Sequence, residues 1–150
     1  MARKYVLDTN CYIDAAGDPA AHPAFAAFCD QAAPALFLSS VVAAELSAGA
    51  ADARSRRALE ERVIGPFLRR GRVLTPSAGS WDMLGTALSL LQEREGLRLA
   101  QVPRSFVFDI LLAHSCREAG AILVSRNTRD LVRIATVFAF EHVTPYPAPR

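Results

Sequence analysis

The stretch Tyr5-Val6-Leu7-Asp8-Thr9-Asn10 decides the fold, because it joins an apolar, strand-forming run to a carboxylate. The run before Asp8 is continuously apolar rather than alternating, which predicts a strand buried on both faces over residues 4–8. Asp8 then lies at the carboxyl end of this strand. An acid in that place could simply cap the next turn, but the Thr-Asn pair that follows it favours a ligand-binding role.

Two further acids lie where the local pattern calls for core. Glu45 follows Val41-Val42-Ala43-Ala44 on a predicted helix, and Asp109 interrupts Phe106-Val107-Phe108-Asp109-Ile110-Leu111-Leu112. Several buried carboxylates raise one another's pKa unless a cation neutralises them. Oxygen ligands without His or Cys suit Mg²⁺ or Mn²⁺. The three acids therefore predict a divalent metal site that supports phosphoryl chemistry.

Glu45 and Asp109 also have simpler interpretations. Glu45 could pair with the arginines of Arg54-Ser55-Arg56-Arg57, which lie nearby in the sequence. Asp109 could be an acid favoured by the dipole at the start of its helix. Their apolar surroundings favour the functional interpretation of both.

Strand-like and helix-like segments alternate along the rest of the chain. Further strands are predicted at 35–38, 72–76, 121–124 and 137–140, and helices around 25–29, from Ser39-Ser40 onward, and over 51–70, 77–94, 104–119 and 128–134. Gly65-Pro66 is expected to break the helix over 51–70, and Trp81, Leu84, Leu88 and Leu91 are expected in the core. The alternation predicts an α/β fold of one domain, residues 1–150, with a central, mostly parallel sheet flanked by helices.

The composition is that of a globular protein, with 51% hydrophobic and 21% charged residues. No apolar run approaches the length of a membrane span, and no signal-peptide core follows Arg3 and Lys4, so we expect a cytoplasmic protein without a membrane. Lys4 is the single lysine among 17 basic residues. Arginine forks suit phosphate, although clusters such as Arg126, Arg129 and Arg133 could equally be solvated helix faces.

Four blocks of the sequence resemble the PIN-domain ribonucleases, especially the VapC-type toxins of bacterial toxin–antitoxin pairs. They are Val6-Leu7-Asp8-Thr9-Asn10, Ser39-Ser40-Val41-Val42-Ala43-Ala44-Glu45-Leu46, Asp109-Ile110-Leu111-Leu112-Ala113 and Val124-Ser125-Arg126-Asn127-Thr128-Arg129-Asp130-Leu131. The resemblance spans nearly the whole chain. It implies a PIN-like fold and a Mg²⁺- or Mn²⁺-dependent endoribonuclease, with Asp8, Glu45 and Asp109 as metal-binding acids.

The fourth position of the site stays open between Asn127 and Asp130. The family often has an acid soon after the last strand, where this chain has Asn127, with Asp130 three residues on. Either Asn127 contributes an amide oxygen or Asp130 supplies the fourth carboxylate, and Asp130 could also be a simple helix-start acid. Whether one or two ions bind is open for the same reason. The resemblance also suggests that Thr9, Asn10 and Ser125 orient the carboxylates or water.

The resemblance implies three partners. They are an RNA substrate, with Arg126 and Arg129 as candidate phosphate contacts, a small antitoxin, and a second copy of the chain in a homodimer. The antitoxin is expected in a groove beside the site, walled by Phe25, Phe28 and the apolar stripe of residues 59–67.

Two other functions fit an acid after a parallel strand. An aspartyl-phosphate phosphatase or receiver domain is less favoured, because Asn10 takes the place of a second aspartate and the single lysine, Lys4, precedes the apolar run of the first strand. A non-catalytic interaction module with the same fold is the other alternative, and the three core acids speak against it.

Overall fold

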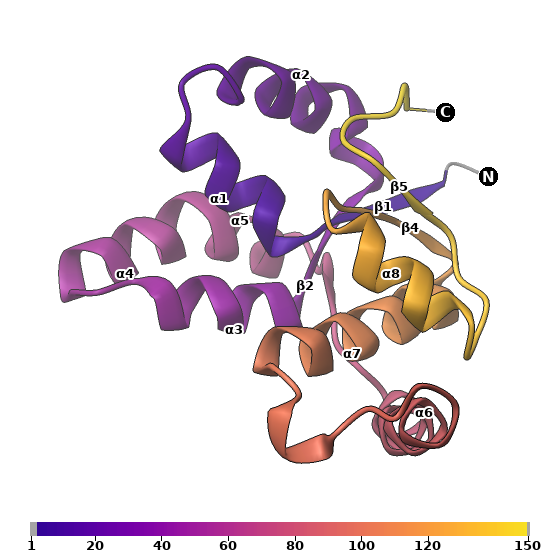
Figure 1. The fold of residues 1–150 in the computed structure, drawn as a ribbon. Helices are drawn as coiled ribbons and strands as arrows, with labels where there is room; N and C mark the ends of the chain where they lie inside the picture. Colours follow the sequence, from indigo (N-terminus) through magenta and orange to yellow (C-terminus); the bar gives the residue numbers. More distant parts are fainter. Residues whose placement is uncertain (1–2, 150) are drawn as a thin grey trace.

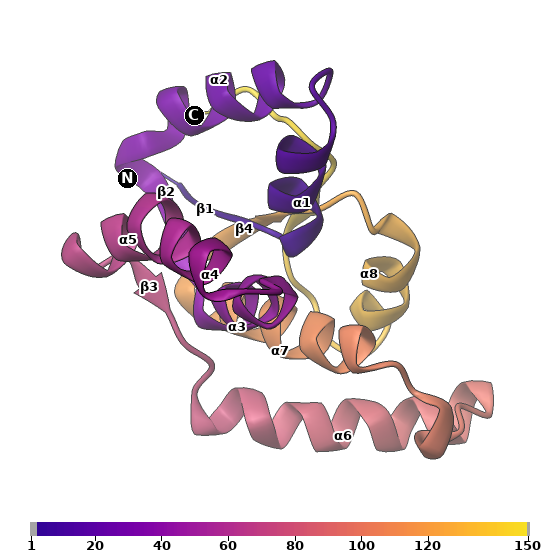
Figure 2. The ribbon, with the colours of Figure 1, turned by 90° about the vertical axis from the view of Figure 1, so that its left-hand side faces the viewer.

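A parallel five-stranded sheet forms the centre of the computed structural model, which describes residues 3–149. The strands lie in the order β3-β2-β1-β4-β5 (Figures 1 and 2). Their bounds are β1 (Lys4–Leu7), β2 (Leu36–Ser39), β3 (Val73–Leu74), β4 (Ala121–Val124) and β5 (His142–Val143). β1 is the middle strand, with Tyr5 opposite Leu36 of β2 and Leu7 opposite Val124 of β4. The predicted α/β class with a parallel sheet is confirmed.

Helices cover both faces of this sheet. They are α1 (Thr9–Gly17), α2 (His22–Ala32), α3 (Ser40–Gly49), α4 (Ala53–Leu59), α5 (Gly65–Arg69), α6 (Ala78–Glu95), α7 (Arg104–Ala119) and α8 (Thr128–Ala135). Figures 1 and 2 show α1 and α2 on one face and α3 and α7 on the other, with α6 outside α7. This double cover explains why the strand runs are continuously apolar: Val6, Leu7 and Leu123 have no exposed surface.

Short side-chain and glycine signals set several element boundaries. The Ser39 hydroxyl accepts a hydrogen bond from the backbone N–H of Val41 at 3.2 Å and caps α3, as its sequence predicted. Gly120 takes a left-handed conformation with φ of 65° and ends α7. The predicted bounds of α7 and β4 agree with the structure.

The segment directly after Asp8, where the sequence predicted no helix, is the helix α1. Cys11, Tyr12 and Ala15 are buried on one side of it. The expected break at Gly65-Pro66 is also wrong, because residues Glu60–Ile64 form a π-helical turn that leads directly into α5. A Cβ at position 65 would lie 2.6 Å from the Glu60 carbonyl oxygen, so the turn requires glycine there.

Two further predictions fail for reasons of tertiary packing. Trp81 is 58% exposed, because α6 packs mainly on α7 and buries only the narrow stripe of Ser80, Leu84, Ala87 and Leu91. The last strand is β5, not residues 137–140, where the backbone N–H groups of Val137 and Phe138 instead donate to the Ile134 carbonyl in a turn after α8. Within residues 3–149, no helix has the length and apolar character to cross a membrane.

Candidate active site

The candidate site lies at the carboxyl ends of the two central strands. Asp8 follows β1 and Ser125 follows β4, and the Asp8 N–H donates to the Val124 carbonyl at 2.9 Å. Because the strands are parallel and adjacent, their ends deliver these two side chains to the same point. The Ser125 hydroxyl donates to Asp8 Oδ2 at 2.6 Å. Figure 1 shows the starts of α1 and α8 meeting near these strand ends.

Asp8 is buried and held by three donors. Besides Ser125, the Thr9 N–H donates to Asp8 Oδ1 at 2.7 Å and the Asn10 amide donates to Oδ2 at 3.3 Å. The bond from Thr9 makes Asp8 the N-cap of α1, so the capping role that the sequence left open is present. Its second oxygen faces Ser125 and Asn10 instead, and a cap alone does not account for these contacts.

Glu45 reaches the same region from α3. The Thr9 hydroxyl donates to Glu45 Oε1 at 2.8 Å, and the side chain is half-buried. Among the described side chains, Glu45 makes no ion pair with Arg54, Arg56 or Arg57. Thr9 therefore connects Glu45 to Asp8.

Asn127 connects the remaining two acids. Its side-chain Nδ2 donates to Asp109 Oδ2 at 2.9 Å and to Asp130 Oδ2 at 3.1 Å, while its backbone N–H donates to the Ser125 hydroxyl at 3.0 Å. Asp109 lies beyond the first turn of α7 and is only 6% exposed. A continuous chain of hydrogen bonds thus joins all four acids through Thr9, Asn10, Ser125 and Asn127.

The electrostatics of this cluster are unfavourable for four free carboxylates. Burial, and then the negative charges of Asp8, Glu45 and Asp130, raise the pKa of Asp109 to about 8. Burial also raises the pKa of Asp8, against the hydrogen bonds from Ser125 and Thr9, and raises that of Glu45. A carboxyl group with a pKa near 8 holds a proton at neutral pH unless a cation stabilises its charged form.

The chemistry of these donors fits a divalent cation such as Mg²⁺ or Mn²⁺. The cluster offers carboxylate oxygens without nitrogen or sulfur ligands, and a cation would relieve the repulsion that raises the pKa of Asp109. The side chains are hydrogen-bonded to one another as they stand, and within residues 3–149 no three His, Cys, Asp or Glu side chains already form a metal cage.

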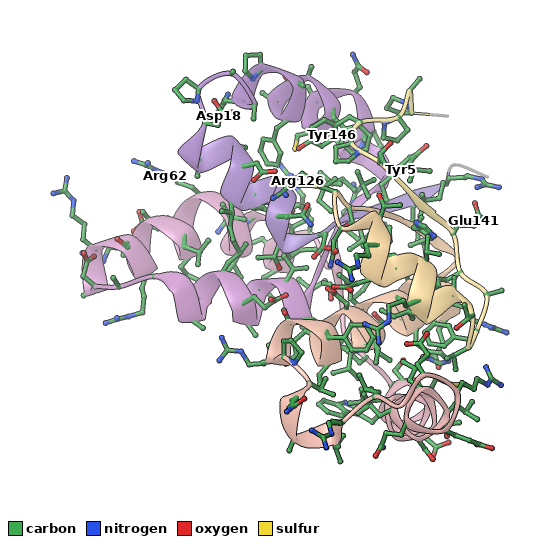
Figure 3. All side chains as sticks on the ribbon, in the orientation of Figure 1. Tyr5, Asp18, Arg62, Arg126, Glu141 and Tyr146 are labelled. Atoms are coloured by element: carbon green, nitrogen blue, oxygen red, sulfur yellow. The ribbon has the colours of Figure 1, made fainter. Side chains whose placement is uncertain are left out.

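The arginines predicted to contact phosphate lie at the start of α8 and just before it. The Arg126 guanidinium donates to both carboxylate oxygens of Asp14, at 2.8 and 3.1 Å, and lies against α1 in Figure 3. Arg129 is exposed. Sequence reasoning did not single out Asp14, which is separated from Arg126 by 112 positions and carries no local signal of this contact.

Comparison with known proteins links this chain to one family. The PIN domain model matches residues 5–137. The fold is similar to VapBC2 of Rickettsia felis bound to a promoter DNA fragment, with 24% identity and a TM-score of 0.66 over 93% of this chain and 97% of that one. It is also similar to DNA-bound VapBC of Salmonella typhimurium, with 22% identity and a TM-score of 0.67 over 95% of this chain and 98% of that one. The similarity to FitAcB of Neisseria gonorrhoeae has 18% identity and a TM-score of 0.65 over 92% of this chain and 95% of that one. Among curated proteins, no sequence matches the chain.

Proposed function

Because the chain belongs to the PIN-domain family, we propose that it is a divalent-metal-dependent endoribonuclease and the toxin of a bacterial toxin–antitoxin pair. The observation that carries this proposal is the hydrogen-bonded cluster of Asp8, Glu45, Asp109 and Asp130 at the carboxyl edge of the sheet. The similar folds belong to VapBC and FitAB complexes, which supports the toxin assignment.

In this proposal the four acids hold a Mg²⁺ or Mn²⁺ ion. Asn127 presents its NH₂ group to both Asp109 and Asp130, so it positions carboxylates, while Asp130 supplies the fourth acidic ligand. Thr9, Asn10 and Ser125 fix the orientation of Glu45 and Asp8 through the hydrogen bonds described above. The chemistry that a cation held by these acids would supply is polarisation of a phosphate oxygen and a lower pKa of a bound water.

An antitoxin would fit an apolar groove between α1, α2 and the helical segment of residues 59–67. Two adjoining cavities of about 390 and 410 Å³ share Tyr12, Phe25 and Val63 in their walls. Ile13 also lines the groove and is 57% exposed. Exposed apolar surface of this kind suits an apolar segment of a partner protein. Phe28, in contrast, is 2% exposed and packs on Tyr5, so it is not a wall of the groove.

The aspartyl-phosphate alternative gains nothing from the geometry. Lys4 begins β1, about 13 Å of strand away from Asp8, and its Nζ lies 5.4 Å from the centre of the Phe37 ring. Two other expectations remain proposals: a homodimer, which rests on the family resemblance, and a location in the cytoplasm.

Sequencing of RNA fragment ends after brief induction tests the ribonuclease proposal directly. Wild type should produce new, recurrent 5′ ends, and Asp8→Asn should not. Purified wild type should bind Mg²⁺ or Mn²⁺ in a calorimetric titration, with binding lost in Asp8→Asn. Equal RNA degradation by wild type and by identically purified Asp109→Asn would indicate a contaminating nuclease and refute the proposal.

A further inference from the structure

The acidic site needs positive charge nearby, because RNA is a polyanion and the four carboxylates repel it before a cation is bound. Two arginines close to the site in sequence already have acidic partners. Arg126 is bound by Asp14, and Arg133 donates to Glu95 at 2.9 and 3.1 Å while its guanidinium lies 4.7 Å from the Phe106 ring centre. Their charges are therefore partly neutralised within the protein.

Arg104 differs from these two arginines. It is the first residue of α7, it is exposed, and among the described residues it has no ion-pair partner. Its guanidinium carbon lies 5.9 Å from the centre of the Phe108 ring, one turn further along the helix. A guanidinium held over an aromatic ring keeps its N–H groups available to a ligand.

The position of Arg104 places this charge beside the acids. α7 ends where β4 begins, so it runs antiparallel to the strands and its first residue lies toward their carboxyl ends. Asp109 follows on the same helix, and α3, which carries Glu45, packs against α7.

We infer that Arg104, supported by Phe108, binds a backbone phosphate of the RNA next to the acidic site and so positions the strand for cleavage. This inference rests on the proposed ribonuclease function. Phosphate is the expected ligand because the guanidinium is permanently charged and presents paired N–H donors that match two phosphate oxygens. Arg104 is a positioning residue, because it holds the substrate beside the reacting groups.

Binding of a labelled single-stranded RNA of mixed sequence tests this role, measured by fluorescence anisotropy in an Asp109→Asn background that does not cleave. Arg104→Gln should weaken binding about tenfold, as expected for one charged hydrogen-bonded contact. The slope of log K against log salt should become shallower by about 0.7. Arg104→Lys should restore most of the slope but less of the affinity, because lysine keeps the charge and loses the fork.

Arg117→Gln is the matched control. Arg117 is exposed on the same helix, about 20 Å from Arg104, and near the opposite edge of the sheet. The Arg117→Gln variant should bind RNA with unchanged affinity and with an unchanged slope of log K against log salt. In the cleaving protein, Arg104→Gln should raise KM more than it lowers kcat.

Three outcomes overturn the inference. If Arg104→Gln binds RNA like Arg117→Gln, Arg104 does not hold the strand. If Arg104→Gln tightens Mg²⁺ binding and leaves the salt slope unchanged, the arginine acts on Glu45 instead. If the parent protein neither binds nor cleaves RNA, the proposed function fails as well, whereas the first two outcomes leave that function intact.

Discussion

Asp109→Asn should stabilise the metal-free protein at neutral pH, although it removes a site residue. Asp109 is buried among three other acids, which together with burial raise its pKa from an ordinary value of 3.8 to about 8. In the folded protein it therefore retains a proton that the unfolded chain releases. The folded state binds more protons than the unfolded state between these values, so the free energy of unfolding falls as pH rises from about 4 to 8.

The size of this effect follows from the displacement of the pKa. One pKa unit corresponds to about 1.4 kcal/mol of free energy. The interval between the ordinary pKa of 3.8 and pH 7 therefore sets an upper bound of about 4 kcal/mol on the stability that Asp109 costs the folded protein at pH 7. We expect about 1–3 kcal/mol, because Asp109 shares its protons with the neighbouring acids. Asparagine has no charge to neutralise and its side-chain oxygen can still accept from Asn127. For a chain of this length the gain corresponds to a rise in Tm of roughly 3–10 °C.

Urea unfolding from pH 5 to pH 8 with a chelator present measures the effect. The stability of wild type should fall over this range relative to Asp109→Asn. Asp82→Asn, which removes an exposed acid on α6, is the matched control and should follow wild type. With saturating Mg²⁺ the order of stability between wild type and Asp109→Asn should change. Wild type gains the free energy of Mg²⁺ binding, about 2.7 kcal/mol at a Mg²⁺ concentration one hundred times Kd, and the variant gains less.

If the free energies of unfolding of wild type and Asp109→Asn change in parallel from pH 5 to pH 8 in chelator, the raised pKa of Asp109 does not destabilise the folded protein. A constant loss of stability in the variant at every pH would assign Asp109 a structural role without charge repulsion.

Three other perturbations test neighbouring parts of the structure. Ser125→Ala removes the buried hydroxyl that holds Asp8, and it should lower the free energy of unfolding by about 1–3 kcal/mol in urea titrations and reduce RNA cleavage. Ile13→Asp should abolish calorimetric binding of the antitoxin, whereas Trp81→Ser, at an exposed apolar position on α6, should bind it like wild type. Burial raises the pKa of Cys29 to about 11, so native protein at pH 8 should react with iodoacetamide much more slowly than urea-unfolded protein, as followed by mass spectrometry.

The sequence placed the strand ends well because that information is local. Continuous apolar runs predicted β1 and β4, and the parallel arrangement then brought Asp8 and Ser125 to one edge. Asp109 was recognisable because it interrupts an apolar helix face. These signals depend on a residue and its immediate neighbours.

Contacts between distant segments were not predictable in this way. Nothing near Arg126 indicates that Asp14 binds it, because the two meet only when α1 packs beside the end of β4. Trp81 follows the helical period of α6, but a helix that packs mainly on one neighbour has no second surface to bury it. The roles of Asn127 and Asp130 likewise depend on the orientation of an amide group, which spacing alone does not determine.

The hydrogen bonds divide the four acids into unequal positions. Among residues 3–149, Asp8 receives bonds from three donors, two of them in the residues that directly follow it, whereas Asp109 receives one, from Asn127. Each strand end therefore delivers acceptors and donors together, whereas the donor to Asp109 is Asn127, which lies outside α7. Burial, and then the charges of Asp8, Glu45 and Asp130, raise the pKa of Asp109, and the bond from Asn127 opposes this rise. A bound cation stabilises the charged form of Asp109, which holds a proton below pH 8 when no cation is bound. Metal binding below pH 8 should therefore release a proton from this residue.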